Sequence, residues 1–344
     1  MKHRVFALLP LLAATLLAQA QAVPNVLFIG NSYTETNNLP QMIADIAQSM
    51  GEMMTFEKNT PGGCSIRQHC SNNSMALIQE GSWNIVVLQE QSQLPSFPQV
   101  QVEQECFPYA QQLVDSIYAH NPEAEPMFFM TWGHKNGDPD NASEYPVLGS
   151  YEGMDSMLYE RYIYMAESND ASLCPVGRVW RYLRTHNPNI ELYRNDGSHP
   201  SVAGSYAAAC SFYVMFFHRD PDSIAFNATL DETTAQAIRT AVKHIVYDSL
   251  SRWQQPRPQN RINSSILPIH LKAYPNPTTT LLTVESSSIP QQIELLNIYG
   301  QILQTYTPSR MPIRINLSGL PAGAYLLQTK TATRKTTQTI IKQH

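Results

Sequence analysis

Between residues 24 and 253, short apolar runs alternate with stretches in which apolar residues recur every three or four positions. The short runs are bounded by turn-forming residues, which is typical of buried strands. They lie at residues 25–30, 53–58, 84–89, 126–132 and 171–176. The amphipathic stretches predict helices, for example at 102–120, 154–168, 201–218 and 231–253. This alternation predicts an α/β domain with a parallel sheet covered on both faces.

The pattern changes abruptly after residue 253. Residues 254–268 are rich in Pro, Gln, Asn and Ser and have no apolar period, which is typical of a linker. Beyond them, short strand-like runs are separated by Gly, Pro and Ser turns, at 281–287, 293–300, 313–320, 324–331 and 337–344. We therefore predict a second domain at 269–344, a small all-β sandwich.

The first 22 residues have the features of a signal peptide. A basic MKHR start precedes the apolar segment VFALLPLLAATLLA, and AQAQA offers cleavage after Ala20 or Ala22. The apolar segment is too short and alanine-rich to favour a membrane-spanning helix. We expect an exported protein whose first folded domain spans residues 23–253, and no later segment approaches spanning length.

Composition narrows the classes of function. Across 344 residues, 23 Lys+Arg face 28 Asp+Glu, so no basic footprint for nucleic acid is present. Export permits disulfides, and Cys64 and Cys70 are close enough in sequence to pair, but the odd total of five cysteines leaves at least one thiol free. No zinc spacing, phosphate loop, calcium loop or HExxH motif occurs, so we predict no metal and no cofactor.

Two motifs together predict nucleophilic catalysis. Ser32 follows the first strand, where ligands bind in α/β folds. Asp196 and His199 lie three residues apart in DGSHP, ahead of a helix. A serine nucleophile needs a base and an acid that orients the base, and this pair supplies both. Taken separately, Ser32 is equally compatible with a helix cap and Asp196-Gly197 with a turn.

The combination of Gly30-Asn31-Ser32 with Asp196-Gly197-Ser198-His199 resembles the SGNH (GDSL-like) hydrolase superfamily over residues 25–253. The resemblance implies a flavodoxin-like three-layer α/β/α sandwich. It also implies that Ser32 is the nucleophile, His199 the general base and Asp196 its orienting acid.

The resemblance also implies an oxyanion hole, for which this family uses three donors. The first would be the backbone N–H of Ser32, and the second that of Gly63, although Gly62-Gly63 is also compatible with a simple tight turn. The usual third block, with its asparagine, is missing from NIVVLQEQSQLP. A glutamine amide can donate in its place. We favour Gln89 over Gln91, the alternative being that both are exposed loop residues.

Three residues are predicted to contact substrate: Asn31, Gln91 and Trp132, the last with core packing as its alternative. The long polar segment 133–153 is expected to frame the cleft. His69 and His134 lie in loops beside the same edge and are interpreted as surface residues.

The C-terminal module resembles the type A sorting domain of the Bacteroidetes type IX secretion system. The segments AYPNPTTTLLTVE, IELLNIYGQIL and LSGLPAGAYLLQTK occur in order between residues 271 and 344. This resemblance implies an immunoglobulin-like sandwich, contact with that secretion machinery, and a final location at the cell surface or outside the cell. An accessory or carbohydrate-binding module is the alternative.

These observations favour a secreted serine esterase that removes acyl groups such as acetate from carbohydrate esters. A lipase or thioesterase for longer acyl chains is the second candidate. A catalytically degenerate surface-binding protein is the third.

Overall fold

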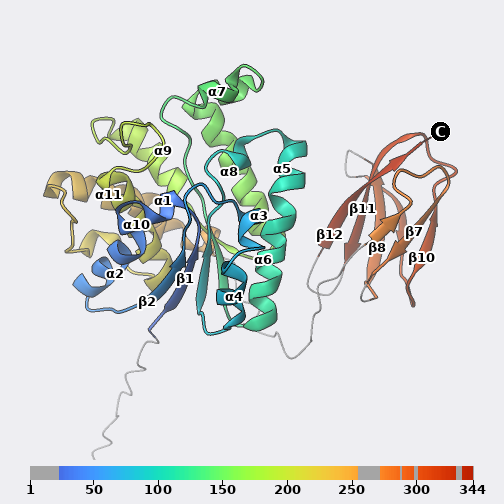
Figure 1. Ribbon diagram of the computed structural model, residues 1–344, viewed down its shortest axis with the longest axis horizontal. Coiled ribbons are helices and arrows are strands. Elements are labelled where there is room, and N and C mark those ends of the chain that lie inside the picture. The colour runs from blue at the N-terminus through green and yellow to red at the C-terminus, as the bar shows by residue number, and fades with distance from the viewer. Residues whose placement is uncertain (1–22, 255–271, 287–288, 298–300, 331–334, 344) are drawn as a thin grey trace, which may run out of the picture.

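The computed structural model describes residues 23–254, 272–286, 289–297, 301–330 and 335–343 (Figure 1). The predicted signal peptide and residues 255–268 of the predicted linker lie outside these ranges. Two separate hydrophobic cores are present in the described residues, one formed between residues 26 and 253 and the other between residues 273 and 340.

The first core is built on a five-stranded sheet. Its strands are β1 (Asn25–Ile29), β2 (Thr55–Asn59), β3 (Ile85–Leu88), β4 (Glu125–Phe129) and β5 (Ser172–Cys174). Their order is β2-β1-β3-β4-β5 and every pairing is parallel. This is the flavodoxin-like order. The predicted α/β fold is confirmed, and each predicted strand is present with slightly different ends.

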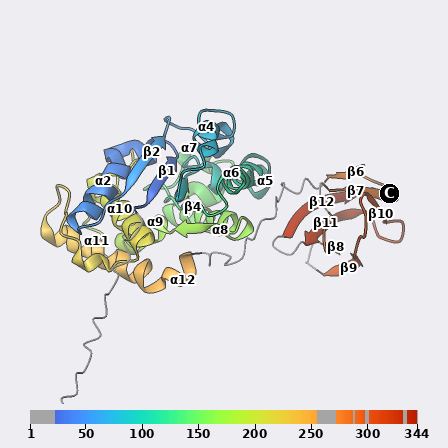
Figure 2. The same ribbon diagram turned by 90° about the horizontal axis from the view of Figure 1, so that it is seen from below.

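Helices cover both faces of the sheet (Figures 1 and 2). One face carries α2 (Leu39–Ser49), α9 (Val176–His186), α10 (Val202–Phe217) and α11 (Glu232–Ile245). The other carries α4 (Ser74–Gln79), α5 (Gln99–Glu105), α6 (Phe107–His120) and α8 (Tyr151–Ser168). Of these, α10 is apolar around most of its circumference and almost wholly buried, as expected for a helix enclosed by its neighbours.

Two predicted helices are broken in the structure. The stretch 102–120 forms α5 and α6 because Pro108, in the first turn of α6, cannot continue a helix from α5. The stretch 231–253 forms α11, a 3-10 turn at Tyr247–Ser249 and α12 (Leu250–Trp253). Apolar periodicity continues across both breaks, which is why the sequence predicted single helices.

The second core lies between two antiparallel sheets. One contains β6 (Lys272–Tyr274), β7 (Leu281–Glu285) and β10 (Ile313–Asn316), in the order β10-β7-β6. The other contains β8 (Gln292–Asn297), β9 (Ile302–Tyr306), β11 (Gly323–Lys330) and β12 (Lys335–Lys342), in the order β12-β11-β8-β9. Buried residues from both sheets form one cluster. The all-β module is confirmed, and its immunoglobulin-like connectivity stays a prediction.

The sheet order determines where a ligand can bind. From β1 the chain crosses to β2 on one side, then returns to β3 on the other, so the loops after β1 and β3 diverge at the carboxyl edge. Ligands of open α/β sheets bind at such a switch point. Within the described ranges, no helix has the length and apolar character needed to cross a bilayer.

Candidate active site

The loop after β1 presents Ser32 at the carboxyl edge. Ser32 is the first residue of the short helix α1 (Ser32–Glu35), and Asn31 caps that helix by accepting a hydrogen bond from the Tyr33 N–H at 3.1 Å. Gly30 precedes them where a side chain has no room, since a Cβ there would lie 2.6 Å from Thr34 Oγ1. At this sharp, glycine-dependent turn Ser32 is half-buried.

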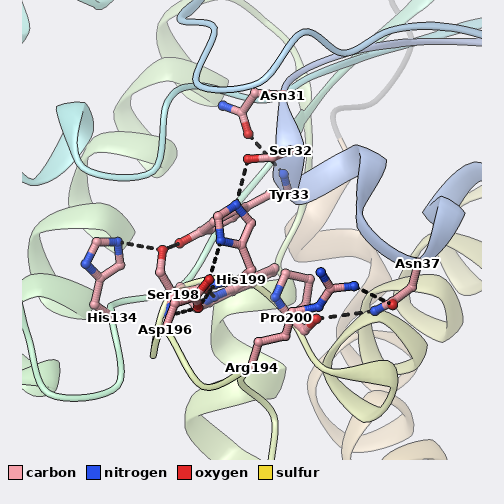
Figure 3. A network of polar contacts seen from close by, with 11 residues as sticks. Asn31, Ser32, Tyr33, Asn37, His134, Arg194, Asp196, Ser198, His199 and Pro200 are labelled. Atoms are coloured by element: carbon pink, nitrogen blue, oxygen red, sulfur yellow. Dashed lines mark hydrogen bonds and ion pairs between the residues drawn. The ribbon is translucent and has the colours of Figure 1, made fainter.

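The predicted triad residues lie in a hydrogen-bonded row (Figure 3). The Oγ of Ser32 is 2.8 Å from Nε2 of His199, and Nδ1 of His199 is 2.7 Å from Oδ2 of Asp196. A carboxylate only accepts, so Nδ1 carries the hydrogen and Nε2 is left to accept the Ser32 proton. These separations are within the reach required of a nucleophile and its general base.

Asp196 is held as an anion by its own turn. Desolvation acts to raise the pKa of Asp196, but the backbone N–H groups of Ser198 and His199 and the His199 ring more than offset it, so the pKa lies below its usual value. Both N–H groups donate to Oδ1 at 2.9 Å. That leaves Oδ2 for the imidazole. The side chains of Asp196 and His199 are 48% and 34% exposed, so the row lies open to solvent.

A second hydrogen-bonded row runs beside the first. The Tyr33 hydroxyl is 2.7 Å from Oγ of Ser198, which is 3.1 Å from Nε2 of His134 (Figure 3). Tyr33 follows Ser32, and Ser198 precedes His199, so this contact ties the Ser32 loop to the His199 loop. Burial lowers the pKa of His134 and favours its neutral form. His134 is half-buried, whereas His69, which was also interpreted as a surface residue, is fully buried, so for His69 that interpretation is wrong.

Asn37 adds a third connection that sequence reasoning missed. Its Nδ2 lies 3.2 Å from the Pro200 carbonyl and 3.0 Å from that of Ser201, and its Oδ1 accepts from Arg194 at 3.0 Å. The residue has a left-handed backbone, φ 57°, which asparagine tolerates better than most residues. Consecutive asparagines after a short helix were the available signal. Asn37 thereby fixes the chain just after His199 against the Ser32 loop.

The structure contradicts the prediction that Gln89 supplies the third oxyanion donor. Gln89 is fully buried, and its Nε2 donates both hydrogens inward, to Asn31 Oδ1 at 2.8 Å and to the Glu90 carbonyl at 2.7 Å. Its Oε1 accepts from the Asn31 N–H and the Thr34 hydroxyl. The amide therefore supports the Ser32 turn from beneath and has no hydrogen left for an oxyanion.

We expect Gln89→Ala to reduce stability more than it reduces catalysis. It leaves several buried groups of Asn31 and Thr34 without partners, so the free energy of unfolding should fall by about 3 kcal/mol or more. Urea denaturation measures this, with Gln91→Ala as the matched control. A loss of about 10²-fold in kcat with unchanged stability would instead restore the oxyanion role.

The other two predicted oxyanion donors are backbone N–H groups, and their role stays a prediction. In the part of the chain that the structure describes, the N–H groups of Ser32 and Gly63 donate to no other protein group. Gly63 is exposed and has a left-handed φ of 69°, which explains why glycine occupies it. Its loop is tied to the Ser32 turn, because Nδ2 of Asn31 donates to the Cys64 carbonyl at 3.0 Å.

The predicted substrate contacts are largely wrong. Asn31 is only 2% exposed, and Trp132 is fully buried between Tyr33 and Trp180, with ring centroids 4.7 and 3.7 Å away. The indole N–H of Trp132 donates to the Ser198 carbonyl at 3.1 Å, so this residue supports the loop that carries Asp196 and His199. Gln91 is half-buried, and its Oε1 accepts from two backbone N–H groups of its own loop.

The cysteines give no crosslink in the structure. All five are free thiols, including Cys64 and Cys70, which were predicted as a possible pair. Cys64 contacts the Ser65 carbonyl and Cys70 that of Tyr109. Within the described residues, no cluster of three His, Cys, Asp or Glu side chains has the arrangement of a metal site.

Comparison with known proteins supports the fold and the C-terminal module. Residues 272–343 match the family of secretion system C-terminal sorting domains. This confirms the predicted sorting module and indicates export to the cell surface or beyond. No curated protein matches the chain at a significant level.

Three of the solved structures similar to this chain cover 56% to 67% of it. A DUF4886 family protein from Bacteroides uniformis is 18% identical with a TM-score of 0.55, covering 67% of this chain and 95% of its own. A candidate SGNH hydrolase from Slackia heliotrinireducens is 25% identical, TM-score 0.46, covering 56% and 98%. An acetyl xylan esterase is 13% identical, TM-score 0.44, covering 56% and 100%. At these identities the likeness concerns the fold.

Proposed function

We propose that this protein is an exported serine esterase of the SGNH type, with Ser32 as nucleophile, His199 as general base and Asp196 as its orienting acid. The observation that carries the proposal is the unbroken row from Ser32 Oγ through His199 to Asp196, at 2.8 and 2.7 Å. The row lies at the switch point of the sheet, where α/β folds bind ligands.

The reaction follows from this geometry. Ser32 Oγ attacks the ester carbonyl carbon while Nε2 of His199 takes its proton, and Asp196 stabilises the resulting imidazolium. The tetrahedral oxyanion accepts hydrogen bonds from the backbone N–H groups of Ser32 and Gly63. Collapse expels the alcohol, which receives the proton from His199, and leaves the acyl group on Ser32. Water repeats the sequence and releases the acid.

The surroundings of the triad favour a short acyl group on a large polar alcohol such as a carbohydrate. Asp196 and His199 are open to solvent, so a bulky substrate can approach. The neighbouring side chains of Ser198 and His134 are polar and half-buried. A lipase for long acyl chains would instead need an apolar trough near the nucleophile.

A chain-length series tests this function. We expect purified full-length protein to hydrolyse 4-nitrophenyl acetate with a higher kcat/KM than 4-nitrophenyl octanoate, and to release acetate from acetylated oligosaccharides. A preference for octanoate would favour the lipase or thioesterase alternative. Absence of hydrolysis of every ester would favour the surface-binding alternative.

The sorting module is proposed to act as an address for the type IX machinery, independent of catalysis. We expect a truncated chain ending at Gln254 to fold and hydrolyse esters, because the two domains have separate cores. In a native Bacteroidetes host, the truncated chain should accumulate in the periplasm while the full chain reaches the surface or medium. Fractionation and an activity assay measure both outcomes. Truncated protein found outside the cell would contradict the sorting role.

A further inference from the structure

The loop that carries Gly63 has little packing of its own. Gly62 and Gly63 are exposed, and a Cβ built on either meets no atom within 4 Å. The loop leads directly into α3 (Ile66–His69), a single turn of helix. A backbone N–H is useful to an oxyanion only when its position is fixed in advance. Something outside the loop must therefore hold it.

Glu90 holds the start of α3. This residue follows Gln89 at the end of β3, and its side chain is completely buried. Its Oε1 accepts hydrogen bonds from the Ile66 N–H at 2.9 Å and from its neighbour Gln91 at 2.6 Å. One carboxyl oxygen thus joins the first turn after the Gly63 loop to the edge of β3.

His69 holds the end of α3. The ring is fully buried, and its Nε2 lies 2.8 Å from the Gly30 carbonyl, which can only accept, so Nε2 carries the hydrogen. Its Nδ1 then accepts from the Ser74 hydroxyl at 2.8 Å. Burial lowers the pKa of His69, which favours this neutral form. Gly30 lies two residues before Ser32, so His69 links α3 to the nucleophile turn.

These contacts place α3 between the ends of β1 and β3, with one buried polar side chain at each end. We propose that Glu90 and His69 are positioning residues, which keep the Gly63 N–H and the Ser32 N–H aimed at the same oxyanion. The inference rests on the proposed esterase function and deepens it. It also accounts for the residues in VVLQEQ that replace the usual third block: Gln89 supports the Ser32 turn, and Glu90 supports the opposite side of the hole.

The cost of Glu90 supports a specific purpose. Among the described residues, no N–H or O–H group donates to its second oxygen, Oε2. The Cys106 thiol, a weak donor, is the side chain that interacts with the carboxyl group. Burial raises the pKa of Glu90 to about 7. The titratable groups that face it have raised pKa values and stay protonated near neutrality: Cys64, Cys70, Cys106 and Tyr162. Burying a carboxyl group without a cation lowers the free energy of unfolding, and an apolar residue of similar size would give a more stable core.

The test compares two substitutions at each position in the full-length chain. Glu90→Met removes the acceptor, whereas Glu90→Gln keeps an oxygen for the Ile66 N–H. His69→Leu and His69→Gln form the matching pair, since glutamine still donates to the Gly30 carbonyl. The control is Asn169→Ala, which removes a buried hydrogen bond to the Met165 carbonyl before β5, at the opposite edge of the sheet.

With 4-nitrophenyl acetate, we expect Glu90→Met and His69→Leu to lower kcat by about 10- to 100-fold, part of the value of an oxyanion donor, with KM changed less than about twofold. Inhibition by phenylboronic acid, which forms a tetrahedral adduct on serine, should weaken in parallel. The glutamine variants should recover most of the lost kcat. Asn169→Ala should lower the melting temperature and leave kcat unchanged.

Hydrogen exchange of the amides of residues 62–66 supplies a readout that does not depend on activity. Exchange should be faster in Glu90→Met than in Glu90→Gln or Asn169→Ala. Unchanged exchange, or an unchanged kcat in folded Glu90→Met, overturns the positioning role. If the wild-type protein hydrolyses no ester, the proposed function fails separately, and the exchange result alone then decides whether Glu90 holds the loop.

Glu90 also predicts a pH dependence of stability. Its pKa in the folded protein, about 7, lies above the usual value of 4.5, so the folded state favours the protonated carboxyl. This contribution is fully present below the usual pKa and is lost as pH rises through about 7. The melting temperature of the wild type should therefore fall more between pH 5 and pH 8, relative to each protein's value at pH 5, than that of Glu90→Gln. Parallel curves would contradict the burial-driven shift.

Discussion

Ser32→Ala should abolish ester hydrolysis while the protein stays folded. The hydroxyl oxygen makes the new bond to the acyl carbon, and removing a serine nucleophile from such a triad lowers kcat on the order of 10⁶-fold. Its hydrogen bond within the described chain is the one to His199, so the substitution removes little packing. The rate with 4-nitrophenyl acetate measures catalysis, and the melting temperature measures folding. Labelling by a fluorophosphonate measures whether a reactive serine is present.

A matched control is Ser156→Ala, which removes a serine hydroxyl that donates to the Glu152 carbonyl within α8. This variant should keep wild-type activity and labelling. If Ser32→Ala kept more than a few per cent of the wild-type rate, another residue would be the nucleophile. If Ser32→Ala lost both activity and folding, Ser32→Cys would decide, because its side chain has the same length as serine. Acylation of the Cys thiol by the ester would support Ser32 as the nucleophile, and absence of acylation would refute it.

Substitutions at His199 and Asp196 should separate proton transfer from orientation. His199→Ala removes the base and should lower kcat nearly as far as Ser32→Ala, because the residues of a triad act as a unit. For the same reason, the double variant should be no worse than either single one. Multiplicative losses would show that the two side chains act independently and would contradict the triad.

Asp196→Asn should cost about 10⁴-fold in kcat with the loop intact. The amide oxygen can still accept from the backbone N–H groups of Ser198 and His199, so the turn is preserved. The amide nitrogen of Asn then faces Nδ1 of His199. Because an amide nitrogen donates and cannot accept, the imidazole favours the tautomer with its hydrogen on Nε2, which cannot take the Ser32 proton. A loss no larger than tenfold would mean that Asp196 serves the turn rather than the base.

The alternation of strands and helices was legible in the sequence because each signal is local. A continuous apolar run such as VLFI is typical of a strand with helices packed on both faces of its sheet, and all four residues are buried. The composition change after Trp253 likewise predicted a second domain with its own core. The GNS and DGSH motifs were recognisable because their chemistry needs specific residue types in short, fixed spacings. Ser32, Asp196 and His199 therefore entered the proposal from sequence and met in the structure at hydrogen-bond distance.

What surrounds the triad was decided only by tertiary structure. An amide after a strand looks the same in sequence whether it faces solvent or the interior, and Gln89 faces the interior because Asn31 and Thr34, more than 50 residues away, offer it partners. Trp132 is likewise buried because Tyr33 and Trp180, which are distant in the sequence, stack on its two faces. The sequence determined which elements form and which chemistry they carry, since both depend on neighbouring residues. Which side chains serve the substrate and which serve the scaffold depends on contacts between distant segments, and these exist only once the sheet has assembled.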